Sequence, residues 1–348
     1  MDNISNIYRC TPDQIKQFTV ACIQASLVPF IQSSPGCGKS QIVKQIAKEY
    51  NLQLIDLRLS TCDVTDLMGL PHFTQDNKAE FMPFNIFPLE NTPLPKGKDG
   101  WLLFLDEFNS APKQIQAAAY KLVLDRQVGI NNLHPRCAIV AAGNLSTDKA
   151  IVNSLSTAMQ SRVVHLEMEV NFNQWLNNVA LKENYDKRII AFLSMYNSKL
   201  MDFDPDHQEK TFACPRTWEF VNRLIINREV TDEIAPLLCG TITSGIAVEF
   251  VQFCKVYKNL ITVQQILADP KNCPIPTETA IKWAITTSIL EHINLQDFEK
   301  ITEYIDRFDI SFRILFYRSV CIRNPEIQNH KAFTRAMASL SRYIYNYG

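Results

Sequence analysis

The chain has 348 residues, 46% hydrophobic and 20% charged, which is enough for one large or two modest domains with buried cores and argues against a disordered protein. Lys and Arg (35) nearly balance Asp and Glu (36), so no global basic field attracts nucleic acid. The ten cysteines form no C-x-x-C pair, which excludes a zinc spacing of that kind and favours buried thiols in a reducing compartment. No signal-peptide core and no run of about 18 apolar residues is present, so we expect a cytoplasmic protein without a membrane segment.

A strand, a loop and a helix are predicted between residues 26 and 50. SLVPFIQ (26–32) is a short apolar run, and KSQIVKQIAKEY (39–50) carries apolar residues at helical spacing. NLQLIDLRLS (51–60) follows as a second strand candidate, after which Asp63 is placed to cap a short helix.

Two excursions from the regular pattern are predicted next. Residues 71–100 contain five prolines and a polar tip, TQDNKAE, which indicate an inserted hairpin plus loop. Residues 128–137 also read as a hairpin. The first is expected to be exposed and to contact a partner rather than a nucleotide.

Three further strands complete the predicted sheet. WLLFL, from residue 101, has the continuous apolar pattern of a strand buried on both faces, and a helix is expected to start at Ser110 and Pro112. Strands are also expected at 137–144 and 163–169, and from about Asn171 onward only helical patterns remain. The alternation predicts an α/β fold with a doubly wound, central parallel sheet.

The loop between the first strand and helix reads SSPGCGKS (33–40) and has the end of a phosphate-binding loop. In such a loop, successive backbone N–H groups surround a phosphate at a helix N-terminus and the lysine reaches the β- and γ-phosphates. Ser33 stands where the usual pattern has its first glycine, at a position where a small residue removes no phosphate-facing N–H. The alternative is a chance match in a turn. The predicted nucleotide-binding residues are Ser34, Pro35, Gly36, Cys37, Gly38, Lys39 and Ser40.

Asp106 and Glu107 end the apolar strand that begins at residue 101. Open α/β sheets bind ligands at the carboxyl ends of their strands, which is where these acids fall. Ser40 and Asp106 are the predicted Mg²⁺ ligands, and Glu107 is predicted to orient or deprotonate the attacking water of an ATP hydrolase. The alternative is a pair of solvated acids at a strand end.

Four motifs together resemble those of AAA+ ATPases: SSPGCGKS, FLDEFNSAP, AAGN and CPRTW. LDEFNSAP followed by a helix ending in LDRQVG is similar to the MoxR and dynein-related branch, and the resemblance covers roughly residues 12–230. It implies a P-loop AAA+ core in residues 1–170 and a helical lid in 171–260. The helical patterns that continue beyond the resemblance predict a C-terminal helical extension in 261–348.

The same resemblance implies three further catalytic residues. Asn144 matches the sensor-one residue that positions the lytic water, Arg162 the arginine finger that reaches the γ-phosphate of the neighbouring subunit, and Arg216 sensor two on the lid. The alternatives are an ordinary asparagine at a strand end and two solvated or structural arginines.

The function expected from these features is a ring-forming ATPase, with a hexamer as the expected homo-oligomer, that uses ATP and Mg²⁺ to remodel a partner protein. Members of the MoxR branch often act with a protein carrying a von Willebrand factor A domain, which makes such a protein the leading partner candidate. One alternative is a nucleic-acid motor, although the 71–100 insertion holds only Lys78, Lys96 and Lys98. Another is a nucleotide-gated scaffold that hydrolyses slowly.

Overall fold

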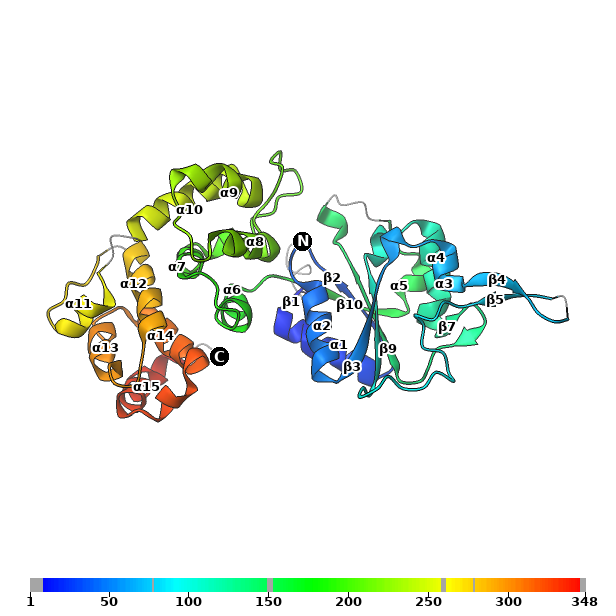
Figure 1. The fold of residues 1–348 in the computed structure, drawn as a ribbon, viewed down its shortest axis with the longest axis horizontal. Helices are drawn as coiled ribbons and strands as arrows, with labels where there is room; N and C mark the ends of the chain where they lie inside the picture. Colours follow the sequence, from blue (N-terminus) through cyan, green and yellow to red (C-terminus); the bar gives the residue numbers. More distant parts are fainter. Residues whose placement is uncertain (1–8, 77, 149–152, 258–260, 278, 345–348) are drawn as a thin grey trace. The chain divides into compact units, whose positions relative to one another are not determined.

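A computed structural model describes residues 9–344 except 77, 149–152, 258–260 and 278 (Figure 1). The chain divides into two compact units. The first contains the described residues up to Asn171 together with Asp204–Asp206, and the second contains Phe172–Phe203 and the residues from His207 onward.

The first unit is built on a six-stranded sheet in which every neighbouring pair is parallel (Figure 1). The order is β1-β10-β2-β9-β6-β3, so strands that are consecutive in the chain are not all neighbours and must be joined by crossovers. The strands are β1 (Arg9–Cys10), β2 (Val28–Gln32), β3 (Leu52–Arg58), β6 (Gly100–Asp106), β9 (Cys137–Gly143) and β10 (Val163–Met168).

Helices cover both faces of this sheet, because alternate residues of each strand point to opposite sides. Helices α1 (Pro12–Gln24) and α2 (Lys39–Glu49) bury Ile15, Val43 and Ile46 against one face. Three others, α3 (Val64–Met68), α4 (Lys113–Leu124) and α5 (Thr157–Gln160), contribute Leu67, Ile115 and Met159 to the cluster on the other face. Short 3-10 turns lie at Leu59–Thr61, Phe108–Ser110 and Ser146–Asp148.

Two antiparallel hairpins interrupt the α/β pattern. In the first, β4 (Leu70–Phe73) pairs with β5 (Ala79–Met82), and in Figure 1 it projects from the body of the unit. In the second, β7 (Gln127–Val128) pairs with β8 (Asn131–Asn132), so the regular pairing is shorter than the predicted 128–137 excursion.

The second unit contains helices and no strand among its described residues, apart from one isolated bridge between Asp202 and Ala213. One buried group surrounds Trp218, whose indole N–H donates to the Lys199 carbonyl at 2.8 Å and whose ring lies 5.6 Å from that of Phe250. A separate cluster joins the last five helices. The elements are α6 (Phe172–Trp175), a π-helical turn (Leu176–Ala180), α7 (Lys187–Met195), α8 (Pro215–Ile225), α9 (Ala235–Ile242), α10 (Ser244–Tyr257), α11 (Val263–Ala268), α12 (Thr279–His292), α13 (Phe298–Ile305), α14 (Ile310–Arg323) and α15 (Lys331–Ile344), with 3-10 turns at Asn197–Leu200, Asp232–Ile234 and Pro325–Asn329.

The predicted α/β fold class is confirmed: a central parallel sheet lies between helical layers, and C-terminal helices follow it. Subdivision of the second unit into a lid (171–260) and an extension (261–348) stays a prediction. Across the described residues, the helices lack the combined length and apolarity needed to cross a bilayer.

Candidate nucleotide site

The loop between β2 and α2 has the backbone shape that its glycines allow. Gly36 and Gly38 have φ values of 77° and 98°, in a region that side chains with a Cβ rarely adopt. Gly38 is the residue before the first turn of α2, so the N-terminal N–H groups of that helix belong to the loop. Such N–H groups, at the positive end of the helix dipole, bind anions.

Lys39 is held by oxygens of its own loop and of the neighbouring strand end. Its Nζ donates to the Ser33 carbonyl at 2.9 Å, the Ser33 hydroxyl at 3.0 Å and the Ser34 carbonyl at 3.4 Å. A fourth bond, of 3.3 Å, goes to Oδ1 of Asn144. Ser33, which replaces the usual glycine and is fully buried, therefore supplies a hydroxyl that contacts the lysine.

Ser40 and Asp106 come together from two different elements. The Ser40 hydroxyl in the first turn of α2 donates to Oδ2 of Asp106, at the end of β6, over 3.1 Å. Asp106 is only 8% exposed. Mg²⁺ prefers oxygen ligands and is usually bound by one or two protein groups plus water and phosphate oxygens, so this hydroxyl and carboxylate fit that ion.

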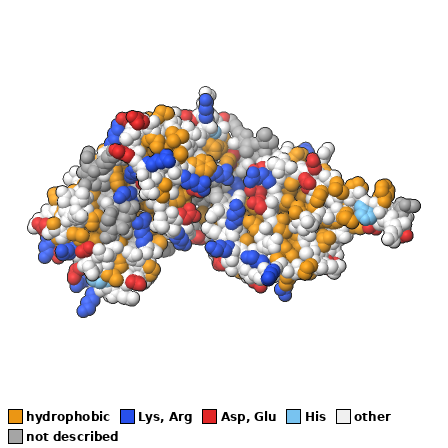
Figure 2. Space-filling model, in the orientation of Figure 1, with side chains coloured by type: hydrophobic (Ala, Val, Ile, Leu, Met, Phe, Trp, Pro, Cys, Tyr) orange, Lys and Arg blue, Asp and Glu red, His pale blue; other side chains and the backbone are white. Residues whose placement is uncertain are grey.

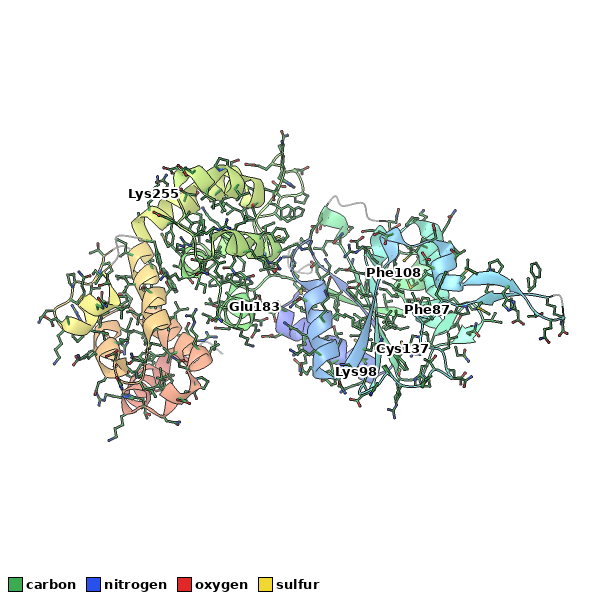
Figure 3. The ribbon with its side chains drawn as sticks, viewed as in Figure 1. Phe87, Lys98, Phe108, Cys137, Glu183 and Lys255 are labelled. Atoms are coloured by element: carbon green, nitrogen blue, oxygen red, sulfur yellow. The ribbon has the colours of Figure 1, made fainter. Side chains whose placement is uncertain are left out.

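Glu107 follows at a bend in the chain. Its φ of 56° lies in the left-handed region, which costs a residue other than glycine about 1–3 kcal/mol and ends the strand sharply. The next side chain, Phe108, is labelled in Figure 3 and is buried in the core of the first unit. Its ring centre lies 5.8 Å from that of Phe30, and this packing fixes the bend to β2. The Glu107 carboxylate accepts from the Ser60 hydroxyl, and its Oε1 lies 3.5 Å from Nε of Arg58.

Asn144 directly follows β9 in the chain. In the sheet, β9 lies between β2 and β6. The side-chain oxygen of Asn144 accepts from Lys39, and the backbone of Asn144 is bound by the side chain of Asn109, a residue that sequence reasoning did not select. Asn109, Ser60 and Arg58 are polar residues near strand ends, but nothing in their spacing predicts these contacts.

Asp148 is a second residue near the loop that sequence reasoning missed. It is 8% exposed, and its Oδ1 accepts from the Ser34 hydroxyl at 3.2 Å. Burial raises the pKa of Asp148 above its usual range, while the Ser34 hydrogen bond and the charge of Lys39 oppose that shift. The loop therefore has a carboxyl group on its flank as well as the lysine.

The two arginines predicted to be catalytic, Arg162 and Arg216, belong to different units. Arg162, between α5 and β10, is exposed; it donates to the Ala158 carbonyl at 2.8 Å, and its guanidinium lies 5.5 Å from the centre of the Tyr120 ring. Arg216 is an exposed residue in the first turn of α8, in the second unit. Its role at the nucleotide site stays a prediction.

Comparisons with known proteins add little to this geometry. No family model matches the chain, and no curated protein matches it. Similar solved structures include a proposed ATPase from Cytophaga hutchinsonii, with 17% identity and a TM-score of 0.36 over 94% of this chain and 87% of that one. Two single-residue variants of RuvB from Thermotoga maritima have 16% identity and TM-scores of 0.33 and 0.34, over 94% of this chain and 88% and 81% of theirs. Likeness at these scores carries no argument about the function of this chain.

The position of Cys37 inside the loop gives a chemical test of the site. Alkylation of this partly exposed thiol is expected to inactivate the protein, and Mg-ATP is expected to slow the reaction because phosphates would fill the loop. Mass spectrometry of the Cys37 peptide measures the rate. Cys239, also partly exposed but in the second unit, is the control and should react equally with and without nucleotide. An unchanged rate at Cys37 would place the nucleotide elsewhere.

Proposed function

We propose that the protein is an AAA+ ATPase of the MoxR-like type. The observation that carries the nucleotide chemistry is the 3.1 Å bond between Ser40 and Asp106, because it joins a loop hydroxyl at a helix N-terminus to a strand-end carboxylate. That pairing is what Mg-nucleotide binding requires. Lys39 and the loop before it, whose backbone has positive φ at Gly36 and Gly38, also support nucleotide binding. The AAA+ and MoxR-like assignment rests on the resemblance of the sequence motifs.

The chemistry follows from the groups around these two residues. The loop N–H groups and Lys39 bind the phosphates, while Ser40 and Asp106 would hold Mg²⁺, which would neutralise phosphate charge when bound. Glu107 accepts a proton from water, and Asn144 orients that water. The water oxygen bonds to the γ-phosphorus as the bond to the bridging oxygen breaks, and ADP leaves with that electron pair.

The finer parts of the proposal concern assembly and partners. Arg162 is assigned as the finger of a neighbouring subunit in a ring, with a hexamer as the expected size, and Arg216 as the lid residue that contacts the same nucleotide. The ring is proposed to act in the cytoplasm and to remodel a protein partner, for which a protein with a von Willebrand factor A domain is the leading candidate.

The two hairpins support a protein partner. Their exposed apolar side chains include Leu70 (51%), Phe73 (78%), Met82 (57%) and Ile130 (64%), and Figure 2 shows hydrophobic side chains along the projecting hairpin. The hairpins adjoin each other, because a Cβ added at Gly129 would lie 3.6 Å from Cβ of Phe81. Exposed apolar groups gathered in this way are typical of interaction sites.

The test of the proposed function is the rate of phosphate release from Mg-ATP, measured with and without duplex DNA. A basal rate that DNA leaves unchanged supports a protein-remodelling ATPase, whereas strong stimulation by DNA would favour the nucleic-acid motor. No release and no nucleotide binding would refute the ATPase. Affinity purification from the native cell with the Glu107→Gln variant would then identify the partner.

The first hairpin is expected to serve the partner and not the hydrolysis. Replacing residues 74–80 by a short Gly-Ser linker should leave the basal ATPase rate close to that of the parent, because the hairpin contributes no group to the site described above. The partner-stimulated rate should fall. A replacement that keeps the assembly intact and abolishes basal turnover would contradict this assignment.

A further inference from the structure

The side chain of Asn109 binds the backbone of Asn144 at two points. Its Nδ2 donates to the Asn144 carbonyl at 2.8 Å, and its Oδ1 accepts from the Asn144 N–H at 3.0 Å. Asn109 is 3% exposed, so little water competes for these bonds. Because the one amide binds both the backbone N–H and the backbone carbonyl of Asn144, it restricts the backbone dihedral angles of that residue.

Gly143 provides the space for this arrangement. A Cβ at Gly143 would lie 2.1 Å from Oδ1 and 2.7 Å from Cγ of Asn109, distances that no side chain tolerates. Asn109 is fixed in turn, because its own carbonyl accepts from the Asn153 N–H at 2.7 Å and its neighbour Phe108 is buried in the core. These contacts hold the backbone of Asn109, and its two bonds to Asn144 orient the amide.

Asn144 links Asn109 to the loop. Its side-chain Oδ1 accepts from Lys39, so the direction of the Asn144 side chain depends on a backbone that Asn109 holds. Asn109 also lies three residues beyond Asp106 in the turn that carries Glu107. It thus connects the strand end that bears the acids to the strand end that bears Asn144.

We propose that Asn109 is a positioning residue for ATP hydrolysis, acting through Asn144 and not through contact with the nucleotide. The inference rests on the proposed function. It requires an amide at residue 109, since a carboxylate in its place can still accept from the Asn144 N–H but cannot donate to the carbonyl.

The test compares Asn109→Asp with Gln116→Glu. Gln116 is a matched control, because it is also a buried amide and its Nε2 donates to a backbone carbonyl, that of Ala111, at 3.1 Å. Asn109→Asp is expected to lower kcat about tenfold or more, while the affinity for ADP and KM for ATP stay close to those of the parent. Gln116→Glu should change kcat little.

A double substitution separates positioning from general damage. If Asn109 acts through Asn144, adding Asn109→Asp to Asn144→Ala should not slow turnover further. Asn109→Ala, which introduces no charge, is the second variant and should give the same pattern if the aspartate variant fails to fold. Full kcat in a folded Asn109 variant, or an equal further loss on the Asn144→Ala background, would overturn the proposal. A parent without ATPase activity would instead refute the proposed function.

Discussion

Lys39→Ala should bind nucleotide at least about 10-fold more weakly than the parent, whereas Glu107→Gln should bind it normally and fail to hydrolyse it. The first substitution deletes a charged donor to the phosphates. The second keeps a side chain that Ser60 can still contact but removes the carboxylate that accepts a proton from water. General bases contribute about 10²–10⁴-fold to rate, and we expect a loss of that size.

Calorimetry with Mg-ADP and phosphate release from Mg-ATP measure these two effects separately. Lys48→Ala is a suitable control, because Lys48 is an exposed lysine in the last turn of the same helix and should change neither quantity. Equal nucleotide affinity for Lys39→Ala and the parent would be incompatible with the proposed loop. Normal turnover by Glu107→Gln would remove Glu107 from the mechanism.

Arg162→Ala should reduce the hydrolysis rate by about 10³–10⁵-fold if the arginine acts as a finger. Within its own chain, the Arg162 guanidinium donates to the Ala158 carbonyl and lies over the Tyr120 ring, and the residue is exposed. Its guanidinium is therefore on the surface, where it can reach a neighbouring copy. Its effect on rate should appear only in the assembled protein.

Mixing variants tests whether the site is shared between copies. Arg162→Ala chains keep an intact loop and Lys39→Ala chains keep an intact arginine, so interfaces between them should regain hydrolysis. A mixture of Lys39→Ala with Glu107→Gln is the matched control, because each chain then lacks part of its own loop-side machinery and no interface is complete. If subunits exchange and the first mixture stays as inactive as the second, Arg162 acts within its own chain or has a structural role.

Five of the six strands of the sheet could be predicted because each has a strong local pattern. Continuous apolar runs such as WLLFL mark strands that are covered on both faces, and β6 is buried along its whole length. β1 could not be predicted, because it is two residues long and exists only through its pairing with Glu167 and Met168. The helix expected from Ser110 begins at Lys113, since Glu107 adopts a left-handed conformation and a 3-10 turn intervenes.

The candidate site could likewise be predicted only in part. The loop and the two acids could be selected as candidates from the sequence, because phosphate and Mg²⁺ binding need those residue types at those spacings. The contacts that hold their side chains could not be predicted. Asn109 lies 35 residues from Asn144, and Ser60 lies 47 residues from Glu107, so each contact depends on how strands are ordered in the sheet. A single sequence contains no local signal for contacts between residues so far apart in the chain.

The four oxygens around Lys39 have a consequence for the thermodynamics of nucleotide binding. A lysine side chain that is free in solution loses up to about 2 kcal/mol of rotamer entropy when it is fixed. Here the loop carbonyls, Asn144 and the hydroxyl that Ser33 adds have already restricted that motion. A phosphate that enters the loop would replace some of these oxygens as the partner of an ammonium group that is already ordered. Ser33, which stands where the usual pattern has a glycine, therefore helps to preorganise Lys39. Less of the free energy of the lysine–phosphate contact is then lost to side-chain entropy.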